Sequence, residues 1–212
     1  MARPRKFDEE RAVDAAMEAF WAAGYEATST QDLCDATGLG RSSIYNTFKS
    51  KHDLFERALA RYMEHKNGEL AELLDGGSDS GSGSDAGAGA GAETGTRTAR
   101  QKLRAVLQRV IDEEFTHHPD GRGCLVVNTA VEVSSHDPAV ATTLERDYGV
   151  RLEMIRGVIE SGQRDGDIAP DKDARTLAHL LIASIGGIRV SARAGVGRAP
   201  LENVADATLA AF

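Results

Sequence analysis

Apolar residues recur at intervals of three and four along most of the chain, which is the spacing of one face of an α-helix. Two clear series of this kind lie in residues 54–63 and 103–115. No segment of the sequence alternates apolar and polar residues between hairpin turns, as a half-buried strand would. The pattern therefore predicts an all-α protein of nine helices.

Residues that favour helix ends divide this pattern into separate helices. Gly24 ends the first helix, whose buried face is predicted to hold Val13, Met17 and Phe20. Ser29, three residues before an aspartate, has the spacing of a capping box and begins the second helix. The remaining helices are expected at about residues 30–38, 41–48, 51–74, 103–115, 124–135, 138–159, 173–194 and 200–212.

One segment interrupts the helical pattern. Residues 75–95 are almost all Gly, Ser, Ala and Asp and hold no apolar residue larger than Ala. Such a segment has nothing to bury, so we expect a flexible linker over residues 75–98. The linker would separate an N-terminal domain of residues 1–66, with its fourth helix leading out of it, from a C-terminal domain of residues 99–212.

The second and third predicted helices are joined by a short turn, Thr37 to Gly40. A turn of this length that contains glycine is typical of a helix-turn-helix, because the tight angle needs an unhindered backbone. With about 100° between successive residues, Ile44 and Phe48 face one side of the third helix, where they can pack on its neighbours. The opposite side is polar and short enough to enter a DNA major groove, and it holds Ser42, Ser43, Asn46 and Lys49.

The distribution of charge supports a local contact with DNA. The 212 residues include 25 Lys and Arg against 33 Asp and Glu, so the chain as a whole is not a general polyanion binder. Residues 41–61, however, hold five basic residues against two acidic ones, and residues 3–6 add three more basic residues. Both patches can neutralise phosphates.

The string GYEATSTQDLCDATGLGRSSIYNTFKSKHDLFERAL resembles the DNA-binding domain of the tetracycline-repressor (TetR/AcrR) family, over about residues 6–66. One departure is Gly40, where the family more often has Ser or Thr. The resemblance implies binding to a double-stranded operator, with base reading by Arg41 and Asn46, whose side chains can make bidentate contacts. The other implied groove contacts are Ser42, Ser43 and Tyr45, and the implied phosphate contacts are Thr28, Ser29, Thr30, Gln31, Lys49 and Lys51.

The stretch LAHLLIASIGGIRV, in the helix expected at residues 173–194, is apolar nearly all round. Such a helix must be covered on both faces. Gly186 and Gly187 in its middle disfavour the helix unless another element approaches closely there. The family resemblance implies a homodimer through helices 173–194 and 200–212, whereas a core contained within one chain is the alternative.

The stretch GRGCLVVNTAVE resembles a subgroup of the family with a Gly-Cys-Leu-x-x-Asn step, some of whose members sense oxidants or electrophiles through that cysteine. A helix N-terminus and Arg122 would stabilise a thiolate at Cys124, and a buried, inert thiol is the alternative. The family also implies an unidentified small-molecule effector in an apolar pocket. The candidate pocket residues, for which ordinary core is the alternative, are Cys124, Val127, Asn128, Val131, Leu152, Ile155, Ile159, Leu181 and Ile185.

Other classes of protein find little support. The sequence shows no signal peptide or membrane span and too few cysteines for a disulfide framework, so we expect a cytoplasmic protein. His117-His118 and His136-Asp137 lack partners at ligand spacing, and no catalytic arrangement is evident, so no metal, cofactor or enzymatic activity is expected. A ligand-independent architectural DNA-binding protein is the alternative, but residues 67–212 carry 15 Lys and Arg against 22 Asp and Glu.

Overall fold

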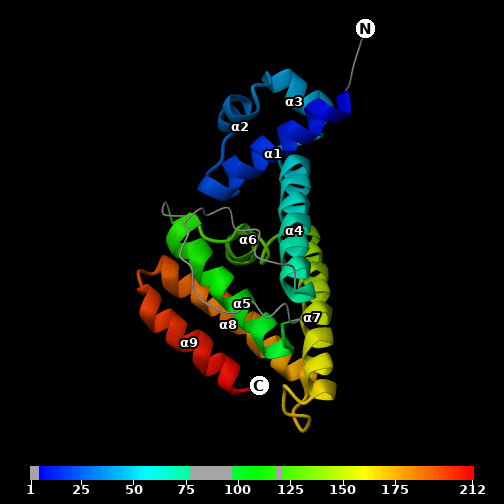
Figure 1. The fold of residues 1–212 in the computed structure, drawn as a ribbon. Helices are drawn as coiled ribbons and strands as arrows, with labels where there is room; N and C mark the ends of the chain where they lie inside the picture. Colours follow the sequence, from blue (N-terminus) through cyan, green and yellow to red (C-terminus); the bar gives the residue numbers. More distant parts are fainter. Residues whose placement is uncertain (1–4, 77–96, 118–120) are drawn as a thin grey trace, which may run out of the picture.

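The computed structural model describes residues 5–76, 97–117 and 121–212, and Figure 1 shows them as helices joined by short turns. These ranges contain nine α-helices and no strand, so the predicted all-α class is confirmed. A π-helical turn, Glu113–His117, follows the fifth helix. The helices are α1 (Arg5–Ala23), α2 (Thr30–Thr37), α3 (Arg41–Thr47), α4 (Lys51–Asp75), α5 (Ala99–Asp112), α6 (Leu125–Glu132), α7 (Pro138–Asp165), α8 (Ala174–Arg193) and α9 (Arg198–Ala210).

Helix ends follow the local chemistry of the sequence. Ser29 and Asp32 form the predicted capping box at the start of α2. Several ends differ from the prediction: the fifth helix spans Ala99–Asp112 rather than 103–115, and the seventh continues to Asp165 rather than ending at residue 159. The sixth helix stops at Glu132 rather than at residue 135, because the chain turns there and the Asp137 N–H bonds the Val133 carbonyl. The ninth begins at Arg198 rather than at residue 200, because Gly197 serves as its N-cap.

The buried face of α1 differs from the expected one. Ala12, Ala16 and Phe20 are the fully buried side chains, at intervals of four residues. Val13 and Met17, which were expected on this face, lie at its edge and are only partly buried. The small alanines allow α1 to lie close against α4, so the sequence pattern gave undue weight to the larger side chains.

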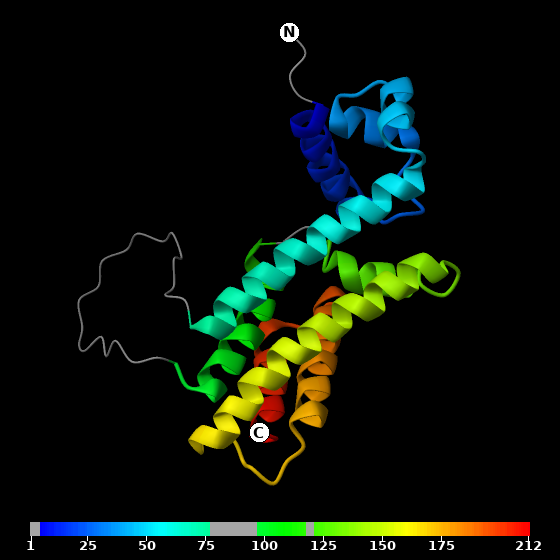
Figure 2. The same cartoon turned by 90° about the vertical axis from the view of Figure 1, so that its right-hand side faces the viewer.

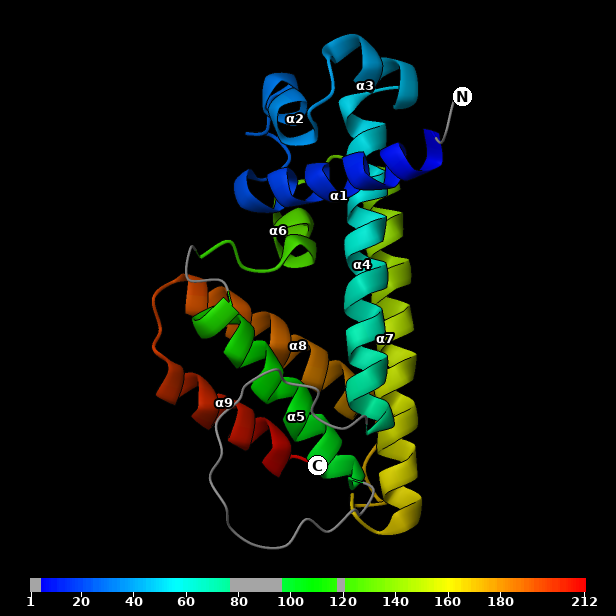
Figure 3. The same cartoon turned by 45° about the horizontal axis from the view of Figure 1, so that its top comes forward.

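The long helix α4 connects the two ends of the molecule. Its first half packs against α1, and α2 and α3 complete this end of the fold (Figures 1 and 3). Its second half lies beside α7 and contacts α5 (Figure 2). The helices α8 and α9 pack on α5 and α7 and complete the other end.

Two hydrophobic cores follow from this arrangement. The upper core contains residues of α1, α2, α3 and α4. It also contains residues much later in the sequence, namely Cys124, Leu125, Val126, Val133 and Val140. The lower core is built from α5, α7, α8 and α9 with Leu74 of α4. The upper core therefore extends beyond the first 66 residues, because α6 and the start of α7 pack into it.

Most of the expected linker lies outside the described residues, which omit 77–96. Its two ends are described, and they belong to helices. Asp75 is the last residue of α4, with Gly76 as C-cap, and Thr98 is the N-cap of α5. Residues 1–4 and 118–120 also lie outside the described ranges, and with them Arg3 of the basic N-terminal segment and His118.

The helix α8 is apolar nearly all round, and one of its faces is uncovered in the single chain. Leu180 and Val190 are exposed there, as is Val204 of the neighbouring α9. A Cβ built on Gly186 or Gly187 would meet no atom within 4 Å. The close approach for which these glycines leave room is therefore not made within the chain. No helix in the described ranges has both the length and the apolar character needed to cross a membrane.

Candidate nucleic-acid interface and ligand cavity

The helix-turn-helix is formed by α2 and α3. Gly38 ends α2 in the left-handed region, with φ +69°, which a residue with a side chain rarely adopts. Gly40 is the N-cap of α3 and offers no side-chain hydrogen bond. Leu33, Ile44 and Phe48 are at most 1% exposed and anchor the two helices on α1 and α4. Local backbone freedom and three apolar side chains thus fix the direction of α3.

The opposite side of α3 faces solvent at the outer end of the molecule (Figure 1). The Tyr45 hydroxyl lies 3.3 Å from the Thr30 hydroxyl of α2, and the Arg41 guanidinium lies 5.9 Å from the Tyr45 ring. These contacts lower the pKa of Tyr45 from its ordinary value, and the hydrogen bond with Thr30 is the largest cause. They join α2 and α3 into one polar surface. The predicted contact residues that are exposed on it are Ser29, Gln31, Arg41, Ser42, Ser43, Tyr45, Asn46 and Lys49.

Thr28 does not belong to this surface, contrary to the prediction. Its side chain is 1% exposed, and its hydroxyl donates to the Gly24 carbonyl at 2.6 Å. This hydrogen bond closes the turn between α1 and α2. Thr28 is therefore a structural residue, and a phosphate could not reach it.

Part of the positive charge expected near DNA is used within the fold. Arg57 forms ion pairs with Glu9 and Asp53, and Arg61 pairs with Asp14 at 3.0 Å. The Lys51 ammonium lies 4.5 Å from the centre of the Tyr25 ring. Because the two arginines hold α4 against α1, the cations on the exposed side of the helix-turn-helix are chiefly Arg41 and Lys49.

A cavity of about 300 Å³ lies between α4, α5, α6, α7 and α8. Its wall is mainly apolar and includes Leu70, Val110 and Ile182. Four of the predicted pocket residues line it, namely Cys124, Val127, Val131 and Ile185. Its volume is at the small end of the range of ligand pockets.

The other five predicted pocket residues do not line this cavity. Asn128 instead donates to the Arg122 carbonyl at 2.9 Å and accepts from Arg193 at 2.6 Å, so it holds the α5–α6 connection to α8. The other four are at most 3% exposed and fill the lower core, because a helical period cannot separate a cavity wall from a packed neighbour. They are Leu152, Ile155, Ile159 and Leu181.

The sequence analysis missed the charged side chains on the cavity wall. The Glu113 carboxylate accepts from Arg189 at 2.7 Å and from Lys66 at 2.9 Å, and Arg189 also pairs with Glu114 at 2.6 Å. Burial opposes ionisation of Glu113, but Arg189 and Lys66 outweigh it and lower its pKa to about 2. We call this group, with Glu69 and Arg109, the Glu113 cluster. A lone arginine within an apolar helix was the signal that could have revealed it.

Cys124 lies on the cavity wall and is the N-cap of α6, so it stands at the expected helix N-terminus. Its side chain is buried, and the Tyr62 hydroxyl donates to Sγ at 3.7 Å. Arg122, which was expected to stabilise a thiolate, pairs with Glu18 at 2.8 Å and lies over the Trp21 ring. The positive charge next to the cysteine in sequence is thus directed towards α1.

The helix α6 connects the cavity to the DNA-binding helices. Val127 and Val131 of α6 line the cavity, whereas Leu125 lies in the upper core. At the end of α6, the Glu132 carboxylate accepts from the backbone N–H groups of Tyr25 and Glu26, at 3.2 and 2.8 Å. These two bonds hold the turn after α1 directly.

Two further contacts support this junction. The Trp21 indole N–H donates to the Gly123 carbonyl at 2.7 Å, just before α6. His52, at the start of α4, contacts the Asp137 N-cap of α7 at 2.5 Å. A displacement of α6 would therefore be transmitted to α1 and to the start of α4.

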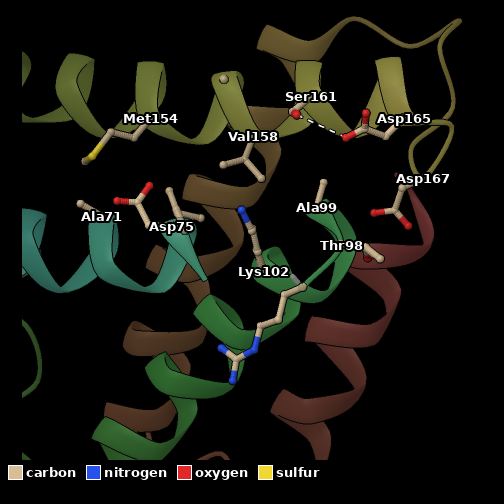
Figure 4. A pocket seen from close by; sticks show the side chains of 13 residues that line it. Ala71, Asp75, Thr98, Ala99, Lys102, Met154, Val158, Ser161, Asp165 and Asp167 are labelled. Atoms are coloured by element: carbon tan, nitrogen blue, oxygen red, sulfur yellow. Dashed lines mark hydrogen bonds between the residues drawn. The ribbon is translucent and has the colours of Figure 1, made fainter. Parts of the chain in front are cut away.

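A second hollow, of about 640 Å³, lies at the lower end of α4 and α7. Figure 4 shows Lys102 of α5 pointing between Asp75 and Val158, with Asp165 and Asp167 nearby. Its wall is as polar as it is apolar, and it lies where the chain enters and leaves residues 77–96. We assign no site to it, because those residues lie outside the described ranges.

A helix-turn-helix at one end of an all-helical chain, carried by a helix that also walls a cavity, defines a class of DNA-binding regulators. Residues 12–58 match the model of the bacterial regulatory proteins of the tetR family, and residues 99–208 match that of the tetracyclin repressor-like C-terminal domain. The chain therefore belongs to the tetR family and is a DNA-binding transcriptional regulator. Regulators of this family are dimers, which agrees with the uncovered face of α8 and α9.

Curated relatives and solved structures agree with this assignment. The HTH-type transcriptional repressor ComR of Escherichia coli (strain K12) is 29% identical over 98% of this chain and 90% of its own. The uncharacterized HTH-type regulator YezE of Bacillus subtilis (strain 168) is 30% identical over 85% of this chain and 84% of its own. A cysteine mutant of the TetR family regulator CifR, complexed with 26-bp operator DNA, is 30% identical with TM-score 0.77, and the match covers 100% of both chains.

Proposed function

We propose that the chain is a transcriptional repressor that binds its operator as a homodimer and leaves it when a small molecule occupies the cavity. The observation that carries this proposal is the position of α6, which lines the cavity and also packs into the core of the DNA-binding helices. Two relatives, ComR and DhaR, are named transcriptional repressors, and CifR is complexed with operator DNA. The place of action is the cytoplasm, where the DNA is.

On the operator, the exposed side of α3 enters the major groove. Asn46 and Arg41 read base edges, because both side chains can make bidentate contacts. The N-terminus of α2 and the cations that flank α3 hold the phosphates, which fixes the register of the protein on the duplex. The phosphate contacts are Ser29, Thr30, Gln31, Lys49 and Lys51.

The homodimer presents two copies of α3 to a near-palindromic operator. In such regulators the two recognition helices stand one DNA turn apart, about 34–36 Å. The dimer contact is the uncovered face of α8 and α9, where Leu180, Val190 and Val204 are exposed. One short helix reads too few base pairs for specificity, so the dimer is needed for operator recognition.

The releasing signal has two possible chemistries at the same cavity. A non-covalent ligand would push on α6 from Val127 and Val131 and thereby strain its bonds to the turn after α1. An electrophile that entered the cavity could instead react with Cys124, whose thiol lines the wall. Both routes would act on the DNA-binding helices through α6.

Footprinting over the DNA upstream of the chain's own gene tests the proposal. The full-length protein should protect one near-palindromic site with half-sites about one helical turn apart. Asn46→Ala at the same concentration is the matched control and should lose that protection. Uniform protection of all DNA would favour the architectural alternative, and no protected site would contradict the repressor proposal.

N-Ethylmaleimide separates the two signals in a Cys34→Ser background, where Cys124 is the remaining cysteine. The thiol adds across the maleimide double bond, so that an S–C bond forms and the proton ends on the neighbouring carbon. Release from the operator that is abolished by a further Cys124→Ser change would establish the covalent route. Unchanged operator binding after complete alkylation would exclude it.

A further inference from the structure

Every charged side chain on the cavity wall belongs to an ion pair. In the Glu113 cluster, three cations (Lys66, Arg109 and Arg189) face three carboxylates (Glu69, Glu113 and Glu114) at 2.6–3.7 Å. On the α7 side, Arg151 pairs with Asp147 at 2.8 Å. Glu114 does not line the cavity, but with it the cations and carboxylates of these pairs are equal in number.

This balance disfavours an ionic ligand. An ion in the cavity would lack a free counter-charge, and its desolvation is costly unless an existing buried pair breaks to serve it. An uncharged molecule avoids both costs. Most of the remaining wall is aliphatic, from Leu70 and Leu73 on α4 to Val106, Val110 and Ile185 on α5 and α8. The wall is thus suited to an uncharged and mainly apolar molecule.

Two unpartnered atoms on the wall indicate one polar group on that molecule. In the described ranges, three buried side-chain nitrogen or oxygen atoms have no hydrogen-bond partner, and two of them, Asn67 Oδ1 and Arg151 Nε, belong to residues of this wall. Both side chains are held by Asp147, to which Asn67 Nδ2 donates at 2.8 Å. Asn67 must turn its NH₂ group to the carboxylate, so its oxygen is left as an acceptor, while Arg151 leaves an N–H donor.

A hydroxyl group matches this pair because it donates one hydrogen bond and accepts another. Neither unpartnered atom is open to water, so a hydroxyl group reaches them only when the Asn67 and Arg151 side chains move apart at the wall. A hydroxyl group there would satisfy both atoms at once, which water outside the cavity does not.

We propose that the effector of this regulator is an uncharged, mainly apolar molecule that carries a hydroxyl group, held between Asn67 and Arg151. The word effector rests on the function proposed above, whereas the ligand chemistry rests on the cavity wall alone. The cavity volume of about 300 Å³ suits a ligand about the size of a small bicyclic compound.

Four probes that share one ring system test the ligand chemistry on the full-length protein. They are 1-naphthalenemethanol, 1-methylnaphthalene, 1-naphthoate and 1-naphthylmethylammonium, with dissociation constants measured by calorimetry at neutral pH. The alcohol should bind at least tenfold more tightly than either ion and at least threefold more tightly than the methyl compound. An ion that binds as tightly as the alcohol, or failure of all four to bind, would overturn the proposal.

Two variants locate the effects. Glu69→Gln removes one carboxylate from the Glu113 cluster, so the affinity for 1-naphthoate should rise threefold or more. Glu72→Gln, on the exposed side of α4, is the matched control and should change nothing. Asn67→Leu should reduce the alcohol to the affinity of the methyl compound. If the alcohol keeps its advantage in a folded Asn67→Leu protein, the hydroxyl is not held there and the proposal fails.

Operator binding separates this inference from the function on which it rests. Release of operator DNA by 1-naphthalenemethanol, at concentrations near its dissociation constant, would support both. Tight binding of the alcohol without any change in operator affinity would support the ligand chemistry but contradict the proposed release. Operator binding with no affinity for the alcohol would contradict the ligand chemistry but would still support the proposed function as a repressor.

Discussion

Asn46 and Lys49 lie on the same exposed side of α3, but their side chains suit different parts of DNA. The Asn amide can donate and accept at one base edge, whereas the Lys ammonium is a point charge suited to a phosphate. Their removal should therefore have different consequences for specificity.

We expect Asn46→Ala to cost about 1–3 kcal/mol on the operator and to relax discrimination at one base position. Lys49→Ala should weaken operator and random DNA alike and reduce the salt dependence by about one counterion per subunit. Fluorescence anisotropy on both DNAs at several salt concentrations measures this. An equal loss on both DNAs for Asn46→Ala would show that Asn46 does not read bases.

Glu113 makes a second prediction at the residue scale, about stability and pH. Its pKa in the folded chain is about 2, against 4.5 for an ordinary glutamate, because Arg189 and Lys66 outweigh the effect of burial. A lowered pKa stabilises the folded state above pH 4.5, and this contribution is lost as the pH falls towards 2. Between pH 7 and pH 3 the loss from this one group is about 2 kcal/mol.

Glu113→Gln should therefore lower the free energy of unfolding strongly at pH 7, because two cations lose their buried partner. The difference from the wild type should shrink by about 2 kcal/mol at pH 3. Urea unfolding at both pH values measures it, with the exposed Glu72→Gln as control. A difference that stays constant with pH would mean that Glu113 is not the ionised centre of its cluster.

At the scale of helices, α6 is the element that unites the cavity and the DNA-binding domain. Glu132 at its end holds two backbone N–H groups of the turn after α1. Gly24 in that turn has φ +87°, and a Cβ there would lie 2.9 Å from Glu132 Oε2. The Glu132 carboxylate therefore packs closely against this turn, which leaves no room for a side chain at residue 24.

We expect Glu132→Ala to weaken operator binding at least threefold, because α1 is then less firmly oriented on α6. The affinity for 1-naphthalenemethanol should change less than twofold, since Glu132 does not line the cavity. Glu145→Ala on the exposed side of α7 is the control. Unchanged operator affinity in a stable Glu132→Ala protein would show that α6 does not transmit through this contact.

Sequence patterns predicted helices and the helix-turn-helix better than the cavity, for a physical reason. A turn such as residues 37–40 is encoded by neighbouring residues, so glycine positions and the burial of Ile44 could be read directly. The packing of α6 against α1 depends on residues over 100 positions apart, such as Trp21 and Gly123. The apolar periodicity of α1 and of α6 does not indicate which segment each helix packs against. The same holds for Glu113 and Arg189, which meet across α5 and α8.

At the scale of the whole molecule, the uncovered face of α8 and α9 predicts how two chains meet. Gly187 is exposed on this face, and a side chain there would contact nothing within the chain. Replacing a mid-helix glycine should even favour the helix by about 0.5–1 kcal/mol. In a dimer that uses this face, the same side chain would hold the two helices apart.

Gly187→Arg should therefore give a stable monomer, whereas the wild type should sediment as a dimer at micromolar concentration. Operator affinity should fall at least tenfold in the monomer, since only one half-site is then bound at a time. Gly68→Arg, an exposed glycine of α4, is the matched control and should remain dimeric. A Gly187→Arg protein that stays dimeric would place the interface elsewhere.

The predicted linker bears on how the two ends of the molecule communicate. Asp75 and Arg97, on either side of residues 77–96, line the same hollow. A Cβ on Gly76 would lie 3.6 Å from the Lys102 side chain, so α4 ends against the first turn of α5. A connection between such neighbouring ends needs little length, and a Gly/Ser/Ala composition predicts a slack chain that transmits almost no force. Any signal from the cavity should then pass through packed contacts such as those of α6.

We therefore expect that deleting about ten residues between positions 78 and 92 leaves operator affinity within twofold of the wild type. The response to 1-naphthalenemethanol should also be kept, because a change in loop length alters the closure entropy by only tenths of a kcal/mol. Inserting ten Gly and Ser residues at the same place is the matched control, and it should likewise change neither the operator affinity nor the response to the alcohol. Limited proteolysis should cut this segment first and leave a dimeric core. A tenfold change in operator affinity with unchanged thermal stability would mean that the segment takes part in signalling, and that α6 is not the main path.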